Sequence, residues 1–386
     1  MNEKRTLVYP YDVEFTPILR HPEMLPGYNI VALVSPQSWG FNGSDAAAAD
    51  GGDKLNISIS SDFEGLMPAC DTVMFSESDR KLDFEGDILP KVVTAAEQGK
   101  DIVFLADLED ENIEALEETC LKFKVKLKFF SSMGDGFFNR DYDYCKLRKI
   151  NTPVVFVTGV YEKTHKFEIQ LSLRDAFINA GYRVSQVGTR NYCEMLGFHS
   201  FPQIMYNSCW SERTKILAFN HYIKDMENTE QPDIIIIGIP GGVMRLNESF
   251  AGRFGITAYE ISQAVSADAV VFSTFYEEYS PEYFNNLITS MKYKLDFDIT
   301  CFNLSNVKFD WDVAKETGRE SYLLMDSSFI DKKKAGYKAL NIPVFNVLNK
   351  EDRINIANCL NDTLSYLGEA GLVWHNPAMF SSIKAK

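Results

Sequence analysis

The chain has 386 residues, which is long for one hydrophobic core and sufficient for two domains. Hydrophobic residues make up 45% of it and aromatic residues 13%, a composition typical of globular proteins and not of long disordered chains. The net charge of −15 argues against a nucleic-acid partner, because binding a phosphate backbone requires a clustered basic surface.

Short apolar runs alternate with helical patterns in the first part of the chain, which is typical of parallel α/β architecture. Helices fall between the strands, with one over 87–99 and one over 110–123. The predicted strands lie at 7–9, 29–34, 72–75, 101–106 and 125–129. A segment rich in Gly, Asp, Asn and Ser at 131–152 then interrupts the pattern. We therefore predict a Rossmann-like, doubly wound domain over 1–135 and a second domain over 136–386.

The alternation restarts at Pro153 and predicts a second doubly wound parallel sheet. Its strands are expected at 154–157, 183–187, 234–237, 269–273, 299–302, 322–325 and 344–347. Its helices are expected at 166–180, 204–226, 256–265, 281–291, 331–340 and 351–367.

The segment VVFVTGVYEKTHKFEIQLSL at 154–173 has the frame of a phosphate-binding loop. Gly159 ends an apolar strand, and Lys166 opens an amphipathic helix seven positions later. In such loops backbone N–H groups and a lysine bind phosphate oxygens, and a Ser or Thr hydroxyl holds Mg²⁺. Here His165 replaces the glycine that precedes the lysine, and Phe167 replaces the hydroxyl residue. The loop is therefore a degenerate Walker A segment.

The seven-residue step from glycine to lysine resembles the longer loop of dethiobiotin-synthetase-like P-loop proteins. NAGYRVSQVGT at 179–189, DIIIIGIPGG at 233–242 and SADAVVFST at 266–274 resemble later strands of the same group, in order. The resemblance covers roughly 153–349 and implies a P-loop-like second domain. One departure is important: Gly238 stands where the group has a carboxylate for the magnesium-bound water, and Asp233 is at the wrong end of that strand.

Without recognisable Mg²⁺ ligands the loop has three interpretations: a site that still binds an anion or nucleotide, a structural relic, or a site of hydrolysis or phosphoryl transfer. ATP or another nucleotide is the candidate cofactor, no metal site is predicted, and no catalytic residue can be assigned. Arg190, directly after a Gly-Thr at a strand end, is a candidate anion contact. The predicted cofactor-binding residues are Gly159, Thr164, His165, Lys166, Thr189, Arg190, Gly241 and Gly242.

Two polar loops, at 9–28 and 35–52, follow the first two predicted strands. Ligands of open α/β sheets bind at the carboxyl ends of strands, so these loops predict a pocket in the first domain. The alternative is that they are surface loops with a packed Trp39.

The longest apolar run, at 233–240, is far shorter than the ~20 residues that span a bilayer, and the N-terminal segment has no apolar core of signal-peptide length. We therefore expect a cytoplasmic protein without a membrane partner. Seven widely spread cysteines without a C-x-x-C pair favour free thiols over disulfides or a metal cluster.

The opening segment at 7–46, the loop at 158–177 and PDIIIIGIPGGV at 232–243 together resemble a family described as peptide maturation system proteins. Members accompany precursor peptides and radical SAM enzymes in ribosomal natural-product clusters, so the resemblance implies such a peptide or enzyme as a partner. It implies no reaction and no catalytic residues. The leading hypothesis is an accessory protein of peptide maturation that holds a nucleotide or anion at the loop.

Two alternatives stay open: an ATP-dependent ligase or kinase-like enzyme that uses Lys166, and a scaffold that binds no nucleotide. A homodimer is plausible, because P-loop relatives of this type often pair across the nucleotide site.

Overall fold

The structure is a computed structural model that describes residues 3–130, 146–338 and 340–369. Over these ranges the chain forms two compact units. The first comprises the residues before 131 together with Arg190–Ser200, and the second comprises 146–189 and the residues from 201 onward. The predicted domain boundary at 135/136 lies outside the described residues.

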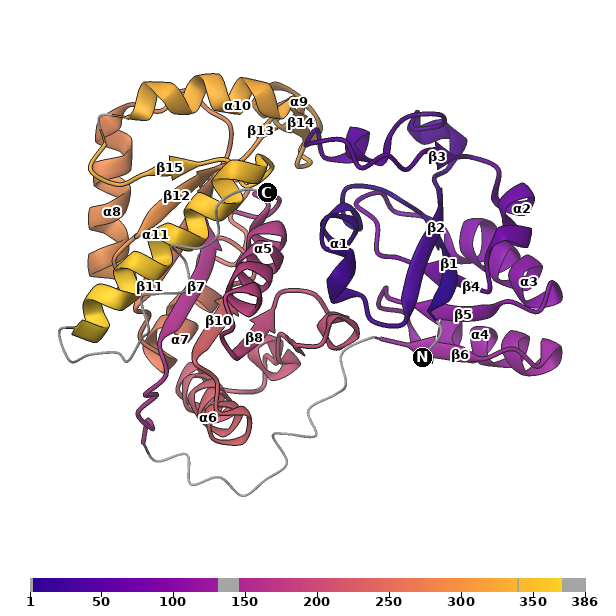
Figure 1. Ribbon diagram of the computed structural model, residues 1–386, viewed down its shortest axis with the longest axis horizontal. Helices are drawn as coiled ribbons and strands as arrows, with labels where there is room; N and C mark the ends of the chain where they lie inside the picture. The colour runs from indigo at the N-terminus through magenta and orange to yellow at the C-terminus, as the bar shows by residue number, and fades with distance from the viewer. Residues whose placement is uncertain (1–2, 131–145, 339, 370–386) are drawn as a thin grey trace. The chain divides into compact units, whose positions relative to one another are not determined.

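The first unit contains a six-stranded parallel sheet in the order β3-β2-β1-β4-β5-β6 (Figure 1). Its strands are β1 (Lys4–Tyr9), β2 (Tyr28–Val34), β3 (Ile59–Ser60), β4 (Thr72–Phe75), β5 (Asp101–Phe104) and β6 (Leu127–Phe129). This is the strand order of the Rossmann fold, whose ligands bind at the carboxyl ends of the strands where the order reverses. The prediction of a Rossmann-like doubly wound domain is confirmed.

The two longest helices of the first unit are α3 (Leu89–Glu97) and α4 (Asp110–Phe123), and both pack against its sheet. They pack Val92, Ala95 and Leu116 against buried residues of β4 and β5. The remaining helices are α1 (Thr16–Arg20) and α2 (Phe63–Leu66), with single turns η1 (Pro22–Met24), η2 (Gln37–Trp39), η3 (Ala46–Ala49), η4 (Met67–Ala69) and η5 (Phe84–Ile88).

The second unit contains six neighbouring strands in the order β15-β12-β11-β7-β10-β8. Their pairings are all parallel. These strands are β7 (Val154–Gly159), β8 (Val184–Gly188), β10 (Ile234–Gly238), β11 (Ala269–Thr274), β12 (Cys301–Leu304) and β15 (Val344–Phe345). The two-residue strand β9 (His199–Ser200) falls in the segment Arg190–Ser200. The central strands β7, β10 and β11 are buried along their whole length, which explains their nearly continuous Val and Ile content.

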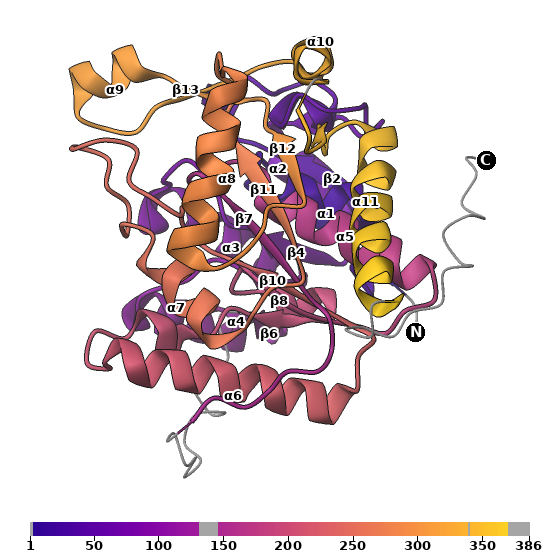
Figure 2. The same ribbon diagram turned by 90° about the vertical axis from the view of Figure 1, so that its left-hand side faces the viewer.

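Helices cover both faces of the second sheet, as Figure 2 shows. On one face α5 (Lys166–Asn179) and α11 (Lys350–Glu369) bury Ile169, Phe177 and Leu360. On the other face lie α6 (Glu212–Glu230), α7 (Ile256–Ala264) and α8 (Pro281–Leu295), which bury Phe219 and Phe284 among others. The prediction of a second doubly wound α/β domain is confirmed.

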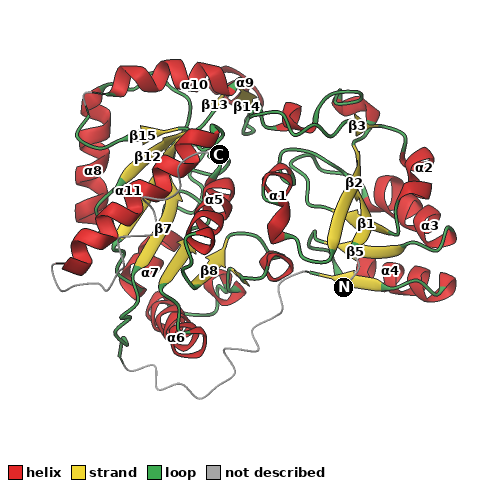
Figure 3. Cartoon of the chain, in the orientation of Figure 1, coloured by secondary structure: helices red, strands yellow, loops and turns green. Residues whose placement is uncertain are grey.

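Three predicted elements differ most from the structure. The helix expected over 331–340 lies earlier in the chain, as α10 (Ser327–Lys334). The segment 322–325 forms β14 (Tyr322–Leu324), which pairs antiparallel with the unpredicted β13 (Val307–Phe309) and does not join the parallel sheet (Figure 3). The helix expected over 204–226 starts only at Glu212, because the Ser211 hydroxyl accepts the Thr214 N–H and caps α6 there. Residues before it form the turns η6 (Cys193–Leu196) and η7 (Gln203–Tyr206). The other helical segments are α9 (Trp311–Thr317), α10 (Ser327–Lys334) and η8 (Ala335–Tyr337).

None of the helices among the described residues combines the length and apolarity that crossing a membrane would require.

Asp12, just after β1, is a buried carboxylate that holds two loops of the first unit together. It accepts hydrogen bonds from the Glu14 N–H (2.9 Å), the Ser78 hydroxyl (2.8 Å) and the Asp79 N–H (2.8 Å). Burial raises its pKa from the ordinary 3.8 to about 6, against the effect of these hydrogen bonds.

This pKa predicts a pH-dependent contribution of Asp12 to stability. Because the folded state holds the proton more tightly than the unfolded state, the contribution is present below about pH 4 and is lost as the pH rises through about 6. The difference in unfolding free energy between the wild type and Asp12→Asn, measured by urea unfolding, should therefore change by about 2 kcal/mol between pH 4 and 6.5. A difference that is constant with pH would contradict the assignment.

Candidate functional site

The loop that follows β7 is fixed by close backbone contact with β11. A Cβ on Gly159 would lie 2.6 Å from the Ser273 carbonyl oxygen and 2.9 Å from the Thr164 hydroxyl oxygen, so only glycine fits. The Val160 N–H donates to that same carbonyl at 2.9 Å. The Ser273 hydroxyl in turn donates to the Thr164 carbonyl. Both ends of the loop are therefore anchored to one strand end.

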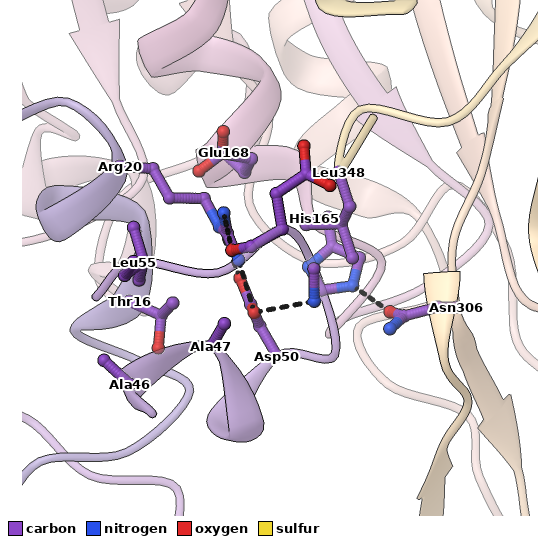
Figure 4. A network of polar contacts seen from close by, with 12 residues as sticks. Thr16, Arg20, Ala46, Ala47, Asp50, Leu55, His165, Glu168, Asn306 and Leu348 are labelled. Carbon is purple, nitrogen blue, oxygen red and sulfur yellow. Dashed lines mark hydrogen bonds and ion pairs between the residues drawn. The ribbon is translucent and has the colours of Figure 1, made fainter. Parts of the chain in front are cut away.

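Thr164 and His165 both make side-chain contacts with other residues of the second unit. Thr164 is fully buried, and its hydroxyl donates to the Tyr161 carbonyl at 3.2 Å. His165 precedes α5 with a left-handed φ of 60°, and its Nε2 pairs with the amide oxygen of Asn306 (Figure 4). Asn306 also donates to the Met325 carbonyl at 2.6 Å. These two predicted residues thus shape the loop and connect it to the segment before β13.

Lys166 is the charged centre of the loop, with only 6% of its surface exposed. Its ammonium donates to the Gly241 carbonyl and lies 3.4 Å from one carboxylate oxygen of Glu162. The other carboxylate oxygen of Glu162 accepts the Gly241 N–H at 2.6 Å. Gly242 is pressed onto the same loop, since a Cβ there would lie 2.4 Å from the Val160 carbonyl oxygen. The structure therefore brings Gly241 and Gly242 onto the Gly159–Lys166 loop.

Gln170, one turn along α5, occupies the space beside Gly238, the position at which the sequence resemblance predicts a carboxylate. A Cβ on Gly238 would lie 2.2 Å from the Gln170 Oε1. The Gln170 amide donates to the Lys166 carbonyl (3.1 Å) and to the Thr189 hydroxyl (3.4 Å), which connects Thr189 to the loop. Gln170 is fully buried, and among the described residues its Oε1 has no hydrogen-bond partner. A neutral amide fills this place, so no charge for Mg²⁺ is supplied there.

Arg190 forms ion pairs with carboxylates of the first unit, and its role as an anion contact stays a prediction. It belongs to the first unit, where its guanidinium pairs with Glu14, after β1, and with Glu77 (3.2 Å), after β4. The next residue, Asn191, donates to Asp107 after β5. Burial raises the pKa of Glu77, and the Arg190 guanidinium opposes that shift.

The N-terminal polar loops bond largely to each other. Arg20 forms a buried bidentate pair with Asp50, with both N–O distances at 2.7 Å (Figure 4). The Tyr11 hydroxyl donates to the Ala46 carbonyl at 2.9 Å. Trp39 is half-buried with the Arg80 guanidinium 5.2 Å from its ring centre. These contacts are those of packed loops, the alternative to a ligand pocket.

Comparison with known proteins supports the fold alone. No protein-family model and no curated protein matches the sequence. Among solved structures, a DUF1611 family protein from Anabaena variabilis is similar with a TM-score of 0.59 at 12% identity, over 94% of this chain and 100% of that one. An amine dehydrogenase from Mycobacterium smegmatis aligns over 40% of this chain and 47% of its own at 16% identity, with a TM-score of 0.28 that is too low to support an inference.

The contact of Gln170 with Gly238 predicts a strong energetic coupling between the two positions. Gly238→Ala should destabilise the protein by about 1–3 kcal/mol, because the new methyl group overlaps a buried amide that has little room to move. In the Gln170→Ala background the same substitution should cost much less, which a double-mutant cycle by urea unfolding measures. Gly336→Ala, where a Cβ meets nothing within 4 Å, is the matched control. Equal costs in both backgrounds would refute the coupling.

The pairing of Arg190 predicts a stability loss on its removal. Arg190→Met leaves two partly buried carboxylates facing each other without a cation, so urea unfolding should show a loss of about 2–3 kcal/mol. Arg183→Met removes a pair with Asp233 whose side chains are 62% and 37% exposed, and should cost clearly less than Arg190→Met, because water screens an exposed pair. A loss at Arg190 no larger than at Arg183 would count against the pairing.

Proposed function

We propose that the protein is a non-hydrolysing accessory factor of peptide maturation that binds a phosphate-bearing ligand, such as a nucleotide, at the Gly159–Lys166 loop. One observation carries the proposal of binding: a lysine ammonium is held almost fully buried at the start of α5, in the frame of a phosphate-binding loop. A buried ammonium costs free energy unless it has partners, and phosphate oxygens are partners of the required charge.

The absence of metal chemistry follows from the residues around the loop. Phosphoryl transfer depends on a cation that neutralises the transferred group. Phe167 lacks the hydroxyl, Gly238 lacks the carboxylate, and Gln170 fills the remaining space with a neutral amide. Binding without turnover is therefore the activity that these residues favour.

The proposed partner, a precursor peptide or a radical SAM maturation enzyme, rests on the sequence resemblance. The loop offers a way for a ligand to affect such a partner, because His165 connects it to Asn306 and through that residue to β14 and its flanking turn. A ligand that repositions the loop would also move His165 and Asn306, and through them the residues that flank β14, as phosphate groups do in switch proteins.

A scaffold without a ligand is the second candidate, and one contact favours it. The Lys166 ammonium already donates to the Gly241 carbonyl, so its charge has a partner within the protein.

Calorimetric titration with ATP, ADP and GTP, with and without Mg²⁺, distinguishes the candidates. We expect micromolar binding that Mg²⁺ does not strengthen, and a loss of tenfold or more in Lys166→Ala, because a hydrogen bond to a charged group contributes about 1.5–3 kcal/mol. Lys292→Ala removes an equal charge from an exposed pair with Asp298 and should bind as the wild type does. No heat with any nucleotide would favour the scaffold, and phosphate release that depends on Lys166 would favour the enzyme.

A further inference from the structure

Glu162 lies inside the loop and contacts the groups that a phosphate-binding loop offers to its ligand. One carboxylate oxygen is 2.6 Å from the Gly241 backbone nitrogen, and the other is 3.4 Å from the Lys166 ammonium. In a working phosphate loop, backbone N–H groups and the lysine donate to oxyanion oxygens in the same manner. Here a carboxylate of the loop itself receives both.

We propose that the Glu162 carboxylate occupies the position of a phosphate group, and that the ligand of this site is an oxyanion without Mg²⁺ that binds by displacing Glu162. The inference rests on the proposed function, since it names the ligand class and the regulation of that same site. Glu162 is a suitable occupant because its two oxygens reproduce two of the oxygens of a phosphate group.

The burial of the participants explains how the exchange can occur. The Glu162 side chain is 52% exposed, whereas that of Lys166 is 6% exposed. The carboxylate can therefore rotate into water and keep its hydration, while the ammonium remains in place. A phosphate group would then restore the charge balance around Lys166 that Glu162 had provided.

A second observation at the same end of α5 independently points to a ligand. The buried Gln170 Oε1 has no hydrogen-bond partner among the described residues, although its amide nitrogen is bonded to the Lys166 carbonyl. A buried acceptor of this kind requires a donor, such as an ordered water or a hydroxyl of a protonated phosphate.

Titration with inorganic phosphate and with ATP, both without Mg²⁺, tests the inference on the full chain. Glu162→Gln removes the charge and Glu162→Ala removes the whole group, so both should bind each probe about tenfold more tightly than the wild type. This factor corresponds to 1.4 kcal/mol. Glu248→Gln removes an equal charge from an exposed position of the loop after β10 and should change the affinity by less than twofold. Adding Lys166→Ala to Glu162→Ala should abolish the gain.

The outcomes separate this inference from the proposed function. Wild-type binding that depends on Lys166, without any gain in the Glu162 variants, would overturn the inference and leave the proposed function standing. An equal gain in Glu248→Gln would reduce the effect to general electrostatics and also overturn it. If Glu162→Ala binds the probes and the wild type does not, the inference that the Glu162 carboxylate occupies the anion position would be supported. The proposed function would then apply only under conditions that move this carboxylate out of the site. Absence of binding in every protein, with unchanged melting temperatures, would reject both proposals.

Discussion

The loop after β7 depends on one polar contact, the hydrogen bond from the buried Lys166 ammonium to the Gly241 carbonyl. It joins the start of α5 to the segment after β10, two elements that flank the central strand β7. Around it Gly242 packs against Val160, and Gly159 packs against Ser273. A charge in such surroundings is tolerated only with polar partners, so the contact fixes the local arrangement of the backbone.

The residues around Lys166 differ from those of a P-loop enzyme in the groups that would hold Mg²⁺. A P-loop enzyme places a hydroxyl and a carboxylate around its lysine to hold Mg²⁺. In this chain the place of the carboxylate has no side chain, and an amide from α5 fills it. The lysine is retained, and its electrostatic balance comes from Glu162 and a backbone carbonyl. The proposal of oxyanion binding rests on this arrangement of charges around the lysine.

The sequence predicts the architecture well and the site only in part, for physical reasons. The central strands are continuous apolar runs because they are buried on both faces, and this signal is local. The strands β3, β9 and β13 are only two or three residues long and leave no such signal. Lys166 and the glycines can be predicted as site residues because phosphate-binding loops have a known spacing of these residue types. The roles of Glu162 and Gln170 cannot be predicted, because glutamate is common in polar loops and glutamine is common in helices. Arg190 shows the same limit, because its carboxylate partners lie over a hundred positions earlier in the chain.

That arrangement of Arg190 also affects how the protein is made. The first unit is discontinuous in the chain, since Arg190–Ser200 belongs to it although the residues on either side of this segment belong to the second unit. Domains generally fold as units while the chain is being synthesised from its N-terminus. Here all six strands of the first sheet are translated before Arg190. Glu14 and Glu77 can pair with the Arg190 guanidinium only after more than sixty further residues have been translated. The first unit is therefore completed only after β7, α5 and β8 of the second have been synthesised.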